Sequence, residues 1–326
     1  MSKFTRHSYE RRSFLKLSLG AAAAAASMAG SALSFAQGTP RTLRIGNQKG
    51  YLNLLKARGT LEKRLAPLNV AVTWTEFNAG PVQLEALNVG SIDFGDVGEA
   101  PPIFAQAAGA PLVYVAATVK RPQSEAVLVP PQSTIRSVAD LKGKRIALNK
   151  GSNVHYFLVK LLRQHGLQYS DVKPVFLAPA DARAAFERAS IDAWVIWDPF
   201  FAAAEKSLGA RVLADASGVV GNRAFYFSSQ NFAANNSDVI RILIEELEKI
   251  DQWGQQNRDQ LASELAQLWG VPKPFVDVVV QRQQFGTVPI TRAILGEQQQ
   301  IADTFLDLGL IPKHVDVLRA APSNLA

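Results

Sequence analysis

Residues 144–156, KRIALNKGSNVHY, predict a short buried strand, a tight turn and the start of a helix. The strand is the apolar run at 146–148, and apolar residues then recur at positions 154, 157, 158, 161 and 162, the spacing of a helix with one buried face. Gly151 permits the turn, and Ser152 is a favourable helix N-cap. Free N–H groups and the dipole at such a helix start attract anions, although an ordinary capped turn of an α/β protein would have the same sequence.

The sequence on both sides of this stretch alternates between strand and helix patterns. Before it we expect strands at 42–46, 70–77, 92–95 and 112–118, and helices at 52–65, 82–88 and 103–108. From residue 144 onward we expect strands at 144–148, 172–177, 193–197 and 211–214, and helices ending at 166 and covering 181–189 and 200–208. This order is typical of parallel sheets covered by helices, and it indicates two similar lobes, although no repeat is evident in the sequence.

The last third of the chain is predicted to be mainly helical. A strand is expected at 225–228, followed by helices at 238–256, 258–268, 274–284 and 291–308. Stretches rich in Pro, Gly or Ser near 130–131 and at 217–222 are candidate crossings between the lobes. A chain of 326 residues is long enough to give each lobe its own core.

Residues 1–36 have the features of a signal peptide. A twin-arginine pattern, ERRSFLK at 10–16, precedes an alanine-rich apolar run at 17–33. Small residues then stand at the usual cleavage spacing, so we expect export and cleavage near Ala36. A membrane anchor is the alternative, but the run is short and only weakly hydrophobic, which favours cleavage.

Charge and composition exclude several classes of function. Residues 1–36 contain five basic side chains and one acidic one, so without them the totals of 35 and 28 fall to 30 and 27, a net charge of +3. This charge does not support nucleic-acid binding. The chain has no cysteine, and the three histidines beyond residue 36 lack metal-ligand spacing. We therefore expect no disulfide, no metal and no cofactor.

Ligands of open α/β sheets bind beyond the carboxyl ends of the strands, and this rule selects the candidate site. The residues at such positions are Gln48, Gly98, Glu99, Ala100, Ser152, Asn153, Trp197 and Asp198. Two prolines without N–H groups follow residues 98–100, so that loop should offer an anion fewer donors than the turn at 152–153. The indole of Trp197 offers apolar area and one N–H group, which suits a short alkyl chain attached to an oxyanion.

Four candidate residues have a structural interpretation as well as a functional one. Glu99 fits a helix-start carboxylate or an ion pair between lobes at least as well as a ligand contact. Asp198, directly before a proline, fits a helix N-cap. Arg223 could bind an oxyanion or form a hinge salt bridge. His155 lies in the first helical turn at the predicted cleft, although a surface position is the more common explanation.

No motif indicates catalysis. The sequence contains no G-x-S-x-G elbow, no phosphate-binding loop and no G-x-G-x-x-G fingerprint. No nucleophile is paired with a base at an identifiable spacing. We therefore expect a binding protein rather than an enzyme.

Four stretches of the chain together point to a known family: LNVGSIDFG (87–95), GEAPPIFAQAAG (98–109), LNKGSNVH (148–155) and AWVIWDPF (193–200). They resemble the aliphatic-sulfonate-binding proteins of ABC importers, within the nitrate/taurine/sulfonate solute-binding group. The resemblance extends over essentially the whole mature chain. It implies a type II periplasmic binding protein, in which two α/β lobes joined by a two-crossing hinge close on a ligand in the cleft between them.

The resemblance also implies an organisation and a set of contacts. We expect a signal peptide at 1–36, lobe I at 37–130 plus 223–326, and lobe II at 131–222. By matching motifs, the implied ligand contacts are Gln48, Gly98, Glu99, Ser152, Asn153, Trp197, Asp198 and Arg223.

The implied function is that of a monomeric periplasmic protein that delivers an alkanesulfonate to a membrane permease for sulfur acquisition. A sulfonate stays ionised at cellular pH and therefore needs fixed hydrogen-bond donors. Two alternatives remain open: the same fold could bind taurine, nitrate or another small organic anion, or it could be an enzyme similar to pyrimidine-synthesising relatives. Trp197 argues against bare nitrate, and the absence of cysteine argues against the enzyme.

Overall fold

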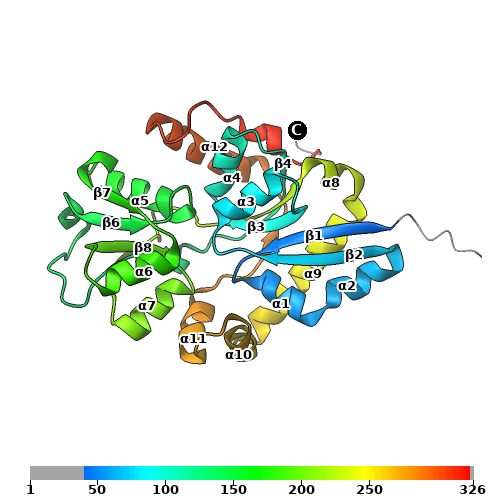
Figure 1. Cartoon of the computed structure of the whole chain (residues 1–326), viewed down its shortest axis with the longest axis horizontal. Coiled ribbons are helices and arrows are strands. Elements are labelled where there is room, and N and C mark those ends of the chain that lie inside the picture. The colour runs from blue at the N-terminus through cyan, green and yellow to red at the C-terminus, as the bar shows by residue number, and fades with distance from the viewer. Residues whose placement is uncertain (1–39, 324–326) are drawn as a thin grey trace, which may run out of the picture. The chain divides into compact units, whose positions relative to one another are not determined.

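The computed structural model describes residues 40–323. The predicted signal peptide, residues 1–36, and its cleavage site near Ala36 lie outside this range. Within it the chain forms two sheets flanked by helices (Figure 1). One sheet has six strands and the other five, and apolar cores lie between the sheets and their helices. No helix among these residues is both long and apolar enough to cross a membrane.

The six-stranded sheet belongs to lobe I. Its strands in spatial order are β11 (Thr287–Val288), β4 (Leu112–Thr118), β10 (Ala224–Ser229), β3 (Phe94–Gly98), β1 (Arg41–Asn47) and β2 (Val70–Glu76). Its helices are α1 (Tyr51–Arg58), α2 (Thr60–Leu65), α3 (Gly80–Asn88), α4 (Pro101–Ala107), α8 (Gln230–Asn235), α9 (Ser237–Gln256), α10 (Arg258–Trp269), α11 (Lys273–Arg282) and α12 (Arg292–Asp307). The predicted helix at 52–65 is divided into α1 and α2 because Gly59 adopts a left-handed conformation with φ 59°.

The five-stranded sheet belongs to lobe II. Its strands in spatial order are β7 (Lys173–Phe176), β6 (Arg145–Leu148), β8 (Ala193–Trp197), β5 (Glu125–Val129) and β9 (Arg211–Asp215). Its helices are α5 (Asn153–Gln164), α6 (Pro179–Glu187) and α7 (Phe200–Leu208). Phe157 of α5 lies in the core on one face of the sheet, and Trp194 lies with Phe186 of α6 in the core on the other.

Both sheets are mixed, whereas the sequence predicts parallel sheets. β10 runs antiparallel to β3 and β4, and β5 runs antiparallel to β8 and β9. Each of these strands enters its sheet from the other lobe, so its direction is set by the crossing and not by a βαβ unit. The sequence does not predict β5 because its five residues, EAVLV, are all buried and lack the alternation of a half-buried strand.

Two crossings at 119–124 and 216–223 join the sheets. The N–H of Arg121 donates to the C=O of Gly221 at 2.9 Å, and the side chain of Asn222 donates to the C=O of Arg121 at 3.1 Å. The second crossing coincides with the predicted stretch at 217–222. The first ends before β5, so the predicted lobe boundary at residue 130 lies too far along the chain for the observed strand pairing.

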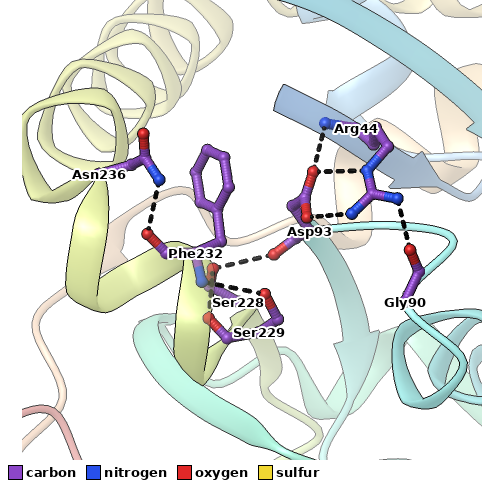
Figure 2. Close-up of polar contacts among 7 residues, drawn as sticks. All are labelled: Arg44, Gly90, Asp93, Ser228, Ser229, Phe232 and Asn236. Carbon is purple, nitrogen blue, oxygen red and sulfur yellow. Dashed lines mark hydrogen bonds and ion pairs between the residues drawn. The ribbon is translucent and has the colours of Figure 1, made fainter. Parts of the chain in front are cut away.

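The first and third strands of lobe I are joined by an Arg–Asp pair that we call the Arg–Asp clasp. Arg44 donates from its backbone N–H and its Nε to Asp93 Oδ2 at 3.0 and 2.8 Å, and from Nη2 to Oδ1 at 2.6 Å (Figure 2). Nη1 of the same arginine donates to the C=O of Gly90. The C=O of Asp93 accepts bonds of 2.9 Å from Ser228 Oγ and from the N–H of Ser229, which ties β10 to the clasp.

Lobe II has the same clasp. Arg145 donates to Asp192 through its N–H, Nε and Nη2 at 2.7, 3.2 and 3.0 Å, and to the C=O of Ala189 at 3.5 Å. Ala189 has a positive φ of 53°, as Gly90 has in lobe I with 72°. The sequences align without gaps: RIGNQKG (44–50) matches RIALNKG (145–151), and GSID (90–93) matches ASID (189–192). The structure thus reveals a repeat that is not evident from the sequence alone.

Candidate ligand-binding site

A cavity of about 170 Å³ lies between the two lobes, beyond the carboxyl ends of their strands, and we call it the interlobe cavity. Seven residues predicted for the site line it: Gln48, Gly98, Ser152, Asn153, Trp197, Asp198 and Arg223. The strand-end rule therefore locates the cavity correctly. Whether each of these residues contacts a ligand stays a prediction.

Three predicted site residues do not line the interlobe cavity. Glu99 and Ala100 come directly after Gly98, and they are 5% and 0% exposed, within the lobe instead. The Glu99 carboxylate accepts the N–H of Arg223 at 3.1 Å, and burial raises its pKa to about 7. Glu99 therefore supports the hinge through a backbone hydrogen bond, which is a structural role but neither the helix start nor the ion pair that the sequence suggested. Neighbouring residues at a strand end face opposite sides, which explains why Gly98 lines the cavity and the residue after it does not.

His155 is fully buried within the protein. Its Nδ1 accepts the N–H of Gly151 at 3.2 Å, and its Nε2 lies 2.8 Å from the hydroxyl of Tyr169. Burial and the charge of Lys150 lower its pKa to about 4, so the imidazole is neutral at pH 7. Its ring also packs 5.5 Å from that of Phe305 in α12. The predicted ligand contact is wrong because this face of α5 is covered by aromatic side chains.

The turn at 152–153 packs closely against lobe I, with Asn153 next to Gly98. A Cβ atom added to Gly98 would lie 2.9 Å from Cβ of Asn153, so only glycine fits there with the lobes in this position. The Asn153 amide donates to a carboxylate oxygen of Glu125 and, at 3.1 Å, to Asn222 Oδ1. Ser152 Oγ donates to the C=O of Asn149 at 2.7 Å. The side-chain donors of this turn are thus already engaged, and the N–H groups of the first turn of α5 are the donors it can offer.

Asp198 and Arg223 both have the structural role that the sequence left open. Asp198 Oδ1 accepts a hydrogen bond of 3.0 Å from the N–H of Ala202 in the first turn of α7. It also accepts one of 3.3 Å from Nη1 of Arg282 in lobe I. The Arg223 guanidinium pairs with Glu297 at 3.0 Å and donates to the C=O of Thr118 at 2.8 Å. Neither side chain is free to give its full charge to a ligand.

The sequence does not single out three residues that the structure places at the cavity. Arg121, Asp96 and Trp269 each line it, and each has a buried polar atom without a hydrogen-bond partner among the described residues, namely Nε, Oδ1 and Nε1. Arg121 lies in the first crossing, three residues beyond the end of β4, so the strand-end rule could have found it. Trp269 comes from the end of α10, and no local signal predicts its position.

The charges around the cavity have both signs. Burial raises the pKa of Asp96 to about 7, although the charge of Arg121 opposes this shift. Glu125 is fully buried behind Asn153, and burial together with the charge of Glu99 raises its pKa well above the usual range. Lys49 adds a cation and donates from Nζ to the C=O of Trp269 at 2.8 Å. The cavity can therefore hold a small organic anion while accommodating a further polar group.

Apolar side chains also line the cavity. They come from both lobes and include Trp197, Phe200, Leu265, Val279 and Val280. No group of three or more His, Asp or Glu side chains between residues 40 and 323 is arranged to hold a metal ion. The cavity therefore offers both charged and apolar surface to a ligand.

The sequence matches the NMT1/THI5-like family over residues 68–257. The putative aliphatic sulfonates-binding protein of Escherichia coli strain K12 is 42% identical over 285 residues, which cover 86% of this chain and 89% of that protein. The crystal structure of the periplasmic aliphatic sulphonate binding protein SsuA from Escherichia coli has a TM-score of 0.80 at 42% identity, covering 86% of this chain and 92% of its own. The alkanesulfonate-binding protein SsuA from Xanthomonas axonopodis pv. citri, bound to MOPS, has a TM-score of 0.82 at 41% identity, covering 87% and 98%.

Proposed function

The chain belongs to the NMT1/THI5-like family, together with relatives named aliphatic sulfonate-binding proteins, and on this basis we propose that it is the solute-binding component of an ABC importer for aliphatic sulfonates. The family and the two-lobed periplasmic binding fold agree with the expectation from the sequence. In this function the protein takes up a sulfonate in the periplasm and delivers it to a membrane permease for sulfur acquisition.

The observation that carries the proposal is the buried Nε of Arg121, which has no hydrogen-bond partner among the described residues, in a cavity whose lining is partly apolar. A sulfonate keeps its charge at every cellular pH, so a fixed cationic donor suits it better than a titrating one. Hydrogen bonds to a charged group contribute roughly 1.5–3 kcal/mol each. The amides at the start of α5 add further donors, and Trp197 and Phe200 offer an apolar surface to the alkyl chain.

The volume of the interlobe cavity favours a short ligand. At about 170 Å³ it is smaller than the pockets of roughly 300–1,000 Å³ that hold drug-sized molecules. Bare nitrate would leave the apolar wall without a contact, which supports a sulfonate with a small alkyl group over that alternative. We expect the affinity to fall as the alkyl chain becomes longer than the cavity can enclose.

The remaining parts of the proposal concern location, partners and chemistry. The twin-arginine segment at 10–16 supports export to the periplasm, and the relatives are named as periplasmic proteins. We propose a monomer that releases its ligand unchanged. In support of binding without turnover, the one serine hydroxyl of the turn at 152–153 donates to a backbone C=O and is not paired with a base.

Isothermal titration calorimetry with ethanesulfonate and butanesulfonate tests the proposal. Both should bind, and R121M should weaken binding at least tenfold, because about 1.4 kcal/mol corresponds to a factor of ten. K120M is the matched control: Lys120 is the preceding residue, pairs with Glu297 at 2.8 Å and does not line the interlobe cavity. Equal affinities for R121M and K120M would place the head group elsewhere. Mass spectrometry of the recovered ligand should show no conversion, and a new product would indicate an enzyme.

A further inference from the structure

One arginine of lobe I directs its charge at lobe II. Arg282 is the last residue of α11, which lies beside α7 of lobe II (Figure 1). Its Nη1 donates to the two carboxylate oxygens of Asp198 at 3.3 and 3.5 Å, and its Nη2 donates to Glu205 Oε2. The guanidinium also lies 3.7 Å from the centre of the Phe201 ring, as a cation–π contact. Within the described part of the chain, all these partners belong to lobe II.

Lobe II offers this guanidinium a matching surface. Phe201 and Glu205 are four positions apart on α7, so they lie on one face of that helix, and Asp198 stands at its start. The N–H of Ala202 donates to Asp198 Oδ1 at 3.0 Å and fixes the orientation of the carboxylate. Two carboxylates and an aromatic ring suit a planar cation that carries its charge at every pH, which is the chemistry of arginine.

The contacts between these charges are largely shielded from water. The side chains of Arg282, Asp198 and Glu205 are 17%, 4% and 23% exposed. A separation of the lobes breaks all the contacts at once and leaves the arginine with no charged partner in its own lobe among the described residues. Close charge pairs across an interface act mainly by slowing its dissociation. We therefore expect these contacts to oppose the opening of the lobes.

Arg282 does not reach the ligand site. Neither it nor Phe201 nor Glu205 lines the interlobe cavity, although Asp198 does. We propose that Arg282 is a latch between the lobes, which favours the closed arrangement before a ligand binds and slows reopening afterwards. The inference deepens the proposed function, on which it rests only for the choice of ligand.

A latch has a signature that a ligand contact lacks. A ligand that binds only closed lobes has an apparent affinity proportional to the fraction of protein that is closed. Arg282 is a positioning residue in this scheme, because it changes that fraction and touches no ligand. Its removal should therefore weaken the binding of every ligand by the same factor.

The distance between the lobes tests the latch without a ligand. The chain has no cysteine, so spin labels can be attached through E76C and A178C. Both positions are exposed, at the end of β2 and just before α6, and neither lines the interlobe cavity. Pulsed electron spin resonance should give a longer and broader label distance for R282M than for the wild-type arginine. An unchanged distance would overturn the inference.

R58M is the matched control because Arg58 makes the same kinds of contact within lobe I. Its guanidinium pairs with Glu264 at 3.0 Å and lies 3.7 Å from the centre of the Trp253 ring. R58M should keep the label distance and the ligand affinity of the wild-type protein. An increase in distance as large as in R282M would show that the loss of any such contact loosens the protein, and would overturn the latch.

Calorimetry with ethanesulfonate and butanesulfonate separates a latch from a ligand contact. R282M should weaken both by the same factor, roughly fivefold or more. E205Q, which changes a partner in lobe II, should act in the same direction, and R282M/E205Q should bind no more weakly than R282M because both changes break one contact. A factor that differs between the two ligands would place Arg282 in the ligand site and overturn the latch. If neither sulfonate binds the wild-type protein, the proposed function fails, whereas the label distance still decides the latch.

Discussion

The two lobes share a framework but differ in what they present to the cavity. The Arg–Asp clasp joins β1 to β3 in lobe I, through Arg44 and Asp93, and β6 to β8 in lobe II, through Arg145 and Asp192. The matching segments 44–50 and 145–151 both place a lysine and a glycine after the first strand. The repeated residues are therefore those that connect neighbouring strands within each lobe.

At the carboxyl ends of the same strands the repeat no longer holds. Lys49 of lobe I lines the interlobe cavity, whereas the ammonium of Lys150 in lobe II lies 5.5 Å from the centre of the Phe176 ring and is not among the lining residues. β3 and β8 differ too, because β3 carries Asp96 at its centre and β8 ends with the indole of Trp197. Repeated strands thus fix the position of the cavity, and the loops after them determine its chemistry.

Breaking the two clasps separately should give the largest effect. The Asp93 side chain is 8% exposed, and the C=O of Asp93 also accepts a hydrogen bond from Ser228 of β10. The Asp192 side chain is 31% exposed. D93A should lower the free energy of unfolding by about 2 kcal/mol, since it removes a nearly buried carboxylate that accepts three hydrogen bonds from Arg44. D192A should cost only about 1 kcal/mol, as is usual for partly exposed pairs. Urea denaturation of both variants measures the difference, and equal losses would show that the clasps are energetically equivalent.

A change in pH should affect the lobes in opposite directions. The pKa of His155 in lobe II is lowered to about 4 by burial, so the folded state favours the neutral ring. Its contribution to stability is complete above the unfolded pKa of about 6.5 and is lost as the pH falls toward 4, by about 3 kcal/mol. Asp96 and Glu99 of lobe I have pKa values raised to about 7, so they favour folding at low pH and lose that contribution as the pH rises through 7.

The variant H155Q isolates the lobe II part of this dependence. Urea denaturation of wild type and H155Q between pH 7.5 and 4 should show their difference in unfolding free energy shrinking steadily as the pH falls. The carboxyl groups are present in both proteins, so their contributions cancel in the difference. A difference that stays constant over this range would mean that the pKa of His155 is the same in the folded and the unfolded state.

The sequence predicts most elements of the fold because their signals are local. β4, β8 and α7 have the predicted bounds, and the strand-end rule brings Gly98 and Trp197 to the cavity. The direction of β5 and β10 follows from the crossings between lobes, which no local pattern encodes. Trp269 reaches the cavity through the packing of α10, which no local pattern predicts, whereas Arg121 follows β4 closely enough for the strand-end rule to have found it. The predicted contact at His155 is wrong because burial depends on what packs against α5.

The two glycines of the repeated turn give the smallest and most direct comparison. Gly151 of lobe II has a φ of 74°, a left-handed conformation that a side chain disfavours, whereas Gly50 of lobe I is extended with a φ of −170°. G151A should lower the free energy of unfolding by about 1–2 kcal/mol, and a Cβ atom there meets Phe104 only at an ordinary 3.4 Å, so the loss reflects the backbone. G50A has no such strain, and its added Cβ atom would lie 3.7 Å from Asp96 Oδ2. Thermal denaturation should therefore separate two substitutions at equivalent positions of one motif. If G50A lost as much stability as G151A, the two turns would constrain their glycines equally. That result would contradict the difference between the two loops that face the cavity.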